Sequence, residues 1–388
     1  MTVHVAGRVW QRVALLASSG LVLAALPMFL VGGLAVQIRR DLGVDARAVG
    51  GAITLAFVVG SVLGPFTGRL VDRIGWRRSV LAGSAAGSLA LLGIPSVGDR
   101  WSVIVGVLVL GGIGVSLMDP GLASLIAGSV ERRRHGLVFG LKEAAIPAAS
   151  LLVGAAIPTL AVEVGWRIAF VVGVLPLVAV MFALWSIGSV ASTFSTTSEE
   201  RVEGVPVDGR IWALAVGGGL SAGGASGVVV LFPETAVEFG MGESGAGTAL
   251  AVGAAFGVVA RVISGIAADR SDRPQIRTIA LMMLGGAVTM SVGLVGTPWA
   301  LVAGLIATFT GGWGWSALFF LSLIRLRPTH PGSAAGIGMA GLGLGNAAGP
   351  LLFGATLTDV GARPAWAAAA SAVLLGSLIT AWSARRVH

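Results

Sequence analysis

Long runs of apolar residues, separated by short polar segments, set the pattern of this chain. A helix of about 20 apolar residues crosses the roughly 30 Å hydrocarbon core of a bilayer. Twelve runs are long enough, and their predicted spans are 13–37, 49–68, 79–97, 102–129, 137–162, 168–190, 211–233, 244–268, 278–295, 300–324, 334–358 and 364–383. The pattern therefore predicts an all-α membrane protein with twelve transmembrane helices.

A polar stretch divides these spans into two sets of six. We predict an N-terminal six-helix bundle at 1–190, a cytoplasmic linker at 191–210 and a C-terminal six-helix bundle at 211–388. The two sets also share a sequence pattern, because the spacing of Gly68, Asp72 and Arg73 recurs in Gly265, Asp269 and Arg270. Parallel repeats of this kind predict two pseudo-symmetric bundles.

Composition agrees with a lipid-solvated chain and excludes several functions. Charged residues make up 11% of the sequence, against about a quarter in soluble domains. The net charge of +8 comes from arginines in short loops, so we expect no nucleic acid as partner. Their placement follows the positive-inside rule, with both termini cytoplasmic in an inner (cytoplasmic) cell membrane. The chain has no cysteine, and its four histidines lie at the termini or in loops. We therefore expect that it binds no metal or cofactor and is not an enzyme.

The stretch from Gly60 to Arg78 carries the most specific signal. Its small residues recur every four positions and form one smooth helical stripe, which lets another helix approach closely. The helix then stops at a charged turn. The segment resembles the loop signature of the major facilitator superfamily of transporters, Gly-x-Leu-x-Asp-Arg-x-Gly-x-Arg-Arg, in Gly68, Leu70, Asp72, Arg73, Gly75, Arg77 and Arg78. The resemblance implies two halves that rock about a midplane site, with the Asp72 and Asp269 hairpins bracing the cytoplasmic side.

Four ionisable residues lie inside predicted spans, where each is costly and is a functional candidate. They are Asp119, Lys142, Glu143 and Arg261. Asp119 and Glu143 are the candidate proton acceptors, although a carboxylate satisfied by a neighbour would explain either one. Lys142, the only lysine, is a candidate substrate ligand or a side chain that reaches the cytoplasmic surface.

The small-residue stripe of the first half is repeated in the second half as Gly257, Arg261, Gly265 and Asp269. Arg261 therefore stands where the first half has Gly64. In the superfamily that the chain resembles, the fifth and eighth helices meet between the halves. Arg261 is therefore expected to pair with Glu143 or to bind a substrate carboxylate, and a fixed structural pair is the alternative. Asn346, Trp313 and Trp315 are further candidates for substrate binding, although packing explains them as well.

The absence of a phosphate-binding loop of the Gly-x-x-x-x-Gly-Lys-Ser/Thr kind favours a secondary transporter driven by an ion gradient. The buried cations favour a small, monocarboxylate-like organic anion as substrate. The segment Gly140–Arg167, with Arg261, looks like carriers of cyanate or small organic anions.

The alternative function is a proton-driven multidrug efflux antiporter, in which Asp119 would hold a lipophilic cation. Drug antiporters usually carry Gly-Pro-x-x-Gly-Gly in the fifth helix, where this chain has Ile146-Pro147-Ala148-Ala149. A sensor or a membrane enzyme on the same scaffold is a further alternative, but no histidine or cysteine lies in a span. The expected partners are a small-molecule substrate, protons and the lipid bilayer, and a monomer is expected.

Overall fold

The computed structural model describes residues 9–97, 100–156, 164–187 and 207–385, which form helices and contain no strand. The first half comprises α2 (Val9–Gly33), α3 (Ala35–Leu42), α4 (Ala46–Ile74), α5 (Trp76–Ser96), α6 (Trp101–Ser129), the short η1 (Arg132–Arg134), α7 (His135–Ala156), α8 (Trp166–Val172) and α9 (Pro176–Ile187). The second half comprises α10 (Gly209–Glu238), α11 (Glu243–Ala268), α12 (Ile276–Met290), η4 (Ser291–Val295), α13 (Pro298–Ala307), η5 (Thr308–Gly312), α14 (Ser316–Leu326), α15 (Pro331–Val360) and α16 (Ala362–Ala384).

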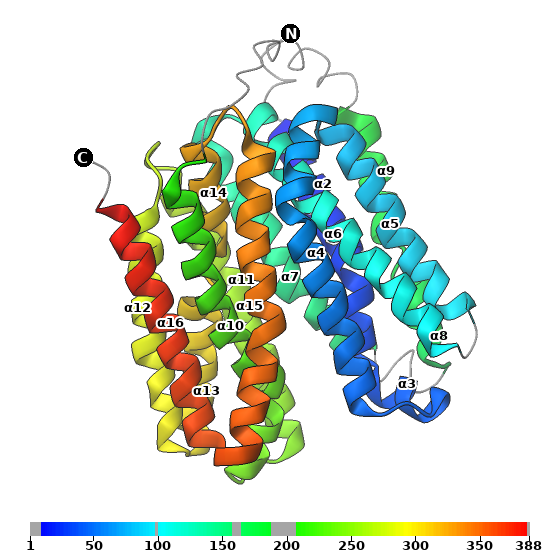
Figure 1. The fold of residues 1–388 in the computed structure, drawn as a ribbon, viewed down its shortest axis with the longest axis vertical. Coiled ribbons are helices and arrows are strands. Elements are labelled where there is room, and N and C mark those ends of the chain that lie inside the picture. The colour runs from blue at the N-terminus through cyan, green and yellow to red at the C-terminus, as the bar shows by residue number, and fades with distance from the viewer. Residues whose placement is uncertain (1–8, 98–99, 157–163, 188–206, 386–388) are drawn as a thin grey trace.

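These helices lie in two groups, as Figure 1 shows, with α4 and α15 facing each other between them. The two helices approach at the end that carries the α4–α5 turn and diverge towards the other end (Figure 1). Eleven helical stretches among the described residues are long and apolar enough to cross a membrane, and α7 takes the place of the predicted fifth span. Most of the predicted linker, 191–206, falls outside the described residues, and Asp208 caps the start of α10.

The sixth and tenth spans are interrupted, whereas the sequence pattern predicted continuous helices. The sixth divides into α8 and α9 because Pro176 has no N–H with which to continue the helix. The tenth passes through the π-helix η5 and a turn at 313–315 before α14 begins. The indole Nε1 of Trp315 donates to the carbonyl of Gly312 at 2.6 Å. This bond satisfies a backbone group that the interruption releases from the helix, as an apolar environment requires.

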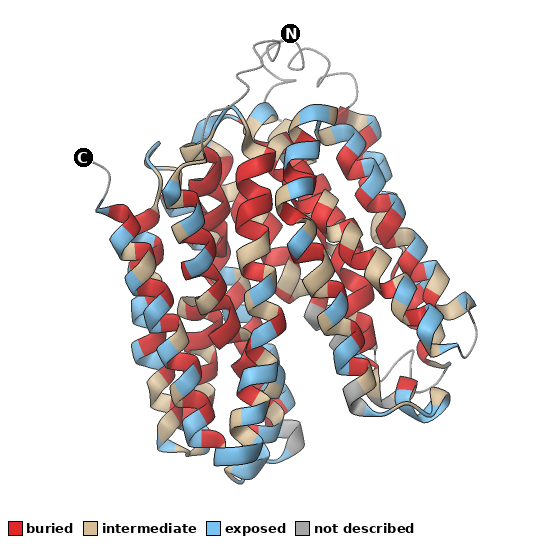
Figure 2. Ribbon diagram, viewed as in Figure 1, coloured by how far each residue is buried: buried red, intermediate tan, exposed pale blue. Residues whose placement is uncertain are grey.

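Close helix packing depends on small residues, and large apolar side chains cover the outside. A Cβ atom at Gly219 of α10 would lie 2.6 Å from the carbonyl oxygen of Gly341 of α15, so these backbones are in direct contact. In contrast, Trp185 and Phe66 are 79% and 63% exposed. Figure 2 shows buried faces turned inward and exposed faces turned outward along most helices. An apolar exterior of this kind is suited to lipid rather than to water.

Candidate functional site

Two aspartates link the halves at the end where α4 and α15 converge. The Asp72 carboxylate, near the end of α4, accepts hydrogen bonds from the N–H groups of Gly332 and Ser333 at 2.9 and 2.8 Å. Both donors lie in the first turn of α15, in the other half. Asp72 therefore supplies an N-terminal cap, which satisfies unpaired N–H groups and complements the positive end of the helix.

Asp269 forms the equivalent link in the opposite direction. It follows α11 and accepts from Gly136 and Leu137 of α7 at 2.6 and 2.9 Å. Burial raises the pKa of the Asp269 carboxyl, while the two N–H donors oppose that rise. The repeat in the sequence thus appears as two equivalent contacts, each from one half to the other.

Glycines make these links possible because the helix backbones touch beside them. A Cβ atom at Gly64 would lie 2.6 Å from the Gly336 carbonyl oxygen, and one at Gly140 would lie 2.7 Å from the Arg261 carbonyl oxygen. Real side chains do not tolerate such distances. The two halves are therefore closed against each other at this end.

The arginines of the predicted motif lie apart from these links. Arg73, Arg77, Arg78 and Arg270 are exposed. Among the contacts of the described residues, none joins one of these side chains to the opposite half. Within the motif, the aspartates and glycines make the contacts between the halves.

A second group of residues forms a buried charge cluster, which we define as Asp119, Lys142 and Glu143. The Lys142 ammonium contacts the Asp119 carboxylate and lies 2.8 Å from Glu143 Oε1. Asp119 comes from α6, whereas the other two come from α7. Lys142 is 0% exposed and the two acids are 6% and 7% exposed, so Lys142 does not reach the surface in this structure.

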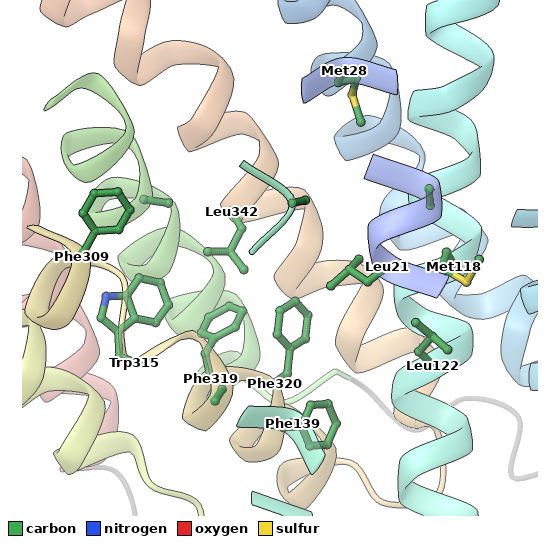
Figure 3. Close-up of a cluster of buried hydrophobic side chains, with 14 of the residues drawn as sticks. Leu21, Met28, Met118, Leu122, Phe139, Phe309, Trp315, Phe319, Phe320 and Leu342 are labelled. Carbon is green, nitrogen blue, oxygen red and sulfur yellow. The ribbon is translucent and has the colours of Figure 1, made fainter. Parts of the chain in front are cut away.

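Aromatic rings cover this cluster from both halves. The Lys142 Nζ atom lies 4.2 Å from the ring centroid of Phe320 on α14 and 5.9 Å from that of Phe139 on α7. In Figure 3 the two rings lie close together, at the edge of a group that includes Phe319 and Trp315. Cation–π attraction strengthens when the cation is desolvated. The ammonium group therefore interacts with both halves of the protein.

Arg261 is also buried but has neutral partners. It is 4% exposed, and it donates from Nε to Ser316 Oγ at 3.1 Å and from Nη1 to the Gly257 carbonyl at 3.0 Å. Its guanidinium carbon lies 5.9 Å from the ring centroid of Trp313.

The direct Arg261–Glu143 pair expected from the sequence is not formed. Glu143 acts on Arg261 through its charge, but its hydrogen bond is to Lys142. The neighbouring lysine thus takes the carboxylate that the prediction gave to Arg261. No carboxylate among the described residues forms an ion pair with Arg261, so its positive charge is held by neutral groups only.

The three weaker candidates have different surroundings. Asn346 accepts a hydrogen bond from Ser226 at 2.6 Å, which joins α15 to α10 within one half. Trp315 is fully buried, and its ring is stacked on Trp313 with the centroids 6.1 Å apart. Trp313 is the one of the three that contacts Arg261.

Sequence reasoning missed Ser316 and Phe320. Ser316 follows the turn in the tenth span, so its contact with Arg261 depends on an interruption that the hydrophobic pattern does not reveal. Phe320 resembles its apolar neighbours in sequence and is distinguished only by the distant Lys142. The described residues contain no group of three or more metal-binding side chains.

Comparisons with known proteins agree with this architecture. Residues 17–350 match the sequence profile of the Major Facilitator Superfamily. Monocarboxylate transporter 11 of Mus musculus is 28% identical over 358 residues, which are 84% of this chain and 78% of that protein. Quinolone resistance protein NorA of Staphylococcus aureus is 27% identical over 151 residues, or 39% of this chain, and the match spans only 36% of NorA.

A solved structure gives the same result for the fold. The proton:xylose symporter XylE, bound to 6-bromo-6-deoxy-D-glucose, superposes with a TM-score of 0.74. The match covers 96% of this chain and 95% of XylE at 17% sequence identity. At that identity the likeness supports the twelve-helix fold alone.

Proposed function

Because the chain belongs to the major facilitator superfamily, and is therefore a membrane transporter and not an enzyme, we propose that it carries a small organic anion together with protons. The substrate class is that of a monocarboxylate. Transport follows alternating access, in which the two halves rock about the buried charged residues. Both the substrate and the proton coupling belong to this proposal.

The observation that carries the substrate class is the buried Arg261 guanidinium without a carboxylate partner. An unpaired charge in an apolar interior is costly. A guanidinium also presents parallel N–H donors that match the two oxygens of a carboxylate. Ser316 and Gly257 already accept one hydrogen bond each, from Nε and Nη1, and a bound monocarboxylate would supply the missing negative charge.

Proton coupling is assigned to the charge cluster. Lys142 is held by two carboxylates, so a proton on either Asp119 or Glu143 removes half of its negative surroundings. The ammonium group also packs on Phe320 of the other half. A change in protonation therefore alters a contact between the halves, which is what a coupled carrier requires.

The runner-up function is proton-driven efflux of lipophilic cations. The partial similarity to the quinolone resistance protein favours it. However, Asp119, the group that would hold a cation, is already paired with Lys142. The longer match to a protein named as a monocarboxylate transporter agrees with the anion instead.

A thermal-stability screen of the purified protein in detergent tests the proposal, since a ligand of the folded state raises the midpoint of unfolding. Small monocarboxylates, cyanate and lipophilic cations are compared at about pH 5.5 and about pH 7.5. We expect a monocarboxylate to raise the midpoint in the wild type and in Arg273→Ala, an exposed control, but not in Arg261→Ala. Stabilisation by cations alone, lost in Asp119→Asn, would contradict the proposal and favour efflux.

A further inference from the structure

Four arginines around the α4–α5 turn have no acidic partner among the described residues. Arg69 and Arg73 lie on the last two turns of α4, while Arg77 and Arg78 lie in the first turn of α5. All four are exposed, and none forms an ion pair or side-chain hydrogen bond within the described part of the chain. The only acidic residue between them, Asp72, is turned towards α15. Four positive charges therefore repel one another within ten residues.

Exposed apolar side chains continue from these arginines along both helices. On α4, Val62, Phe66 and Leu70 are 52%, 63% and 42% exposed, and they follow one another at four-residue spacing. On α5, Leu81 and Leu89 are 43% and 59% exposed. Figure 2 shows the α4–α5 turn exposed at the end of the molecule. Each helix thus presents an apolar outer face that ends in a basic group.

We propose that this surface binds an anionic phospholipid, and we call it the hairpin surface, made of Arg69, Arg73, Arg77 and Arg78 with Phe66 and Leu81. Guanidinium groups bind phosphate oxygens in pairs, and arginines beside a membrane are attracted to anionic headgroups. The acyl chains lie along the exposed apolar side chains of α4 and α5. A lipid satisfies both parts of the surface, whereas a free phosphate satisfies only the arginines.

The equivalent turn in the second half differs in charge. After α11, the exposed Asp272 lies between Arg270 and Arg273, so an acid offsets part of the basic charge. The backbone carbonyl of Arg273 also accepts a hydrogen bond from the Arg325 side chain (Nη1) at 2.9 Å. The repeat thus supplies a matched control surface with the same residue types and a lower net charge.

The test measures lipid binding to the purified, delipidated full chain by native mass spectrometry and by thermal stability. The probes are phosphatidylglycerol, phosphatidylcholine with the same acyl chains, and soluble glycerol phosphate. We expect phosphatidylglycerol alone to bind and to raise the unfolding midpoint. In Arg73→Gln/Arg77→Gln its apparent affinity falls by about 30-fold, from the attraction of about 1 kcal/mol for each arginine.

The control Arg273→Gln/Arg277→Gln has the same change in charge and is expected to retain wild-type affinity. Arg73→Lys/Arg77→Lys keeps the charge and is expected to lose much less affinity for phosphatidylglycerol than Arg73→Gln/Arg77→Gln. This difference would show that the loss in the glutamine variant comes from the charge and not from misfolding. Equal binding of phosphatidylcholine, or equal losses in both glutamine variants, would overturn the proposal. Equal stabilisation by glycerol phosphate would show a free-anion site instead of a lipid site.

Discussion

At the scale of single residues, the proposed recognition of the anion depends most on the guanidinium of Arg261. Replacing it by lysine keeps the charge but removes the paired N–H donors and the planar guanidinium, whose central carbon lies 5.9 Å from the ring centroid of Trp313. We expect Arg261→Lys to weaken monocarboxylate binding by about 10-fold, and Arg261→Ala to weaken it further. Ligand-dependent tryptophan fluorescence measures this, because Trp313 lies beside the site. Unchanged affinity in the lysine variant would exclude paired recognition of a carboxylate.

The two buried carboxylates give a separate prediction. Asp119→Asn and Glu143→Gln each remove one carboxylate that contacts Lys142 and that we propose as a proton acceptor. We expect both variants to lose most of the substrate accumulation driven by a pH gradient, because each removes a buried carboxylate that could take up the coupled proton. Exchange of labelled for unlabelled substrate, which needs no net proton movement, should continue. If a variant accumulates substrate as the wild type does, the carboxylate that it lacks is not the proton-coupling group.

At the scale of helices, the two aspartate caps hold one end closed. Removing a cap costs about 1 kcal/mol, so Asp72→Ala or Asp269→Ala should shift the equilibrium constant between the closed and open arrangements by about fivefold towards the open one. The chain has no cysteine, so spin labels on Glu131→Cys and Asp272→Cys report the distance between the halves without background labelling. Asp45→Ala is the matched control, because Asp45 caps α4 within its own half at 2.7 Å. A distance distribution that changes equally in the control would mean general destabilisation rather than gating.

Most helices could be predicted from the sequence because lipid demands long apolar runs. The repeated Gly68–Asp72 and Gly265–Asp269 spacing predicted close helix packing and two repeated halves, but only the structure shows that these glycines lie where the halves meet. The interruption at 313–315 could not be predicted from hydropathy, because its residues are as apolar as those of a continuous transmembrane helix. The Arg261–Glu143 ion pair, one of the two expectations for Arg261, is not formed in the structure for a related reason. The choice between Lys142 and Arg261 depends on side-chain positions that spacing along a helix does not determine.

At the scale of the whole molecule, the contacts suggest how the halves are coupled. The caps of Asp72 and Asp269 and the glycine contacts beside them close one end. The charge cluster and Arg261 are buried between the halves, with Phe320 and Ser316 contributed by the same helix, α14. Substrate on Arg261 and a proton on the cluster would therefore both act on α14. This shared helix gives substrate and proton a common route to the movement of the halves.

Transport by the purified protein in liposomes is the most direct test of proton-coupled anion transport. With an acidic exterior, we predict that a labelled monocarboxylate accumulates inside, that a protonophore abolishes the accumulation, and that Arg261→Ala liposomes show none. Protons should enter together with the anion, which a pH-sensitive dye in the lumen detects as acidification. Exchange of a lipophilic cation for protons, with no movement of any monocarboxylate or cyanate, would contradict transport of a small organic anion.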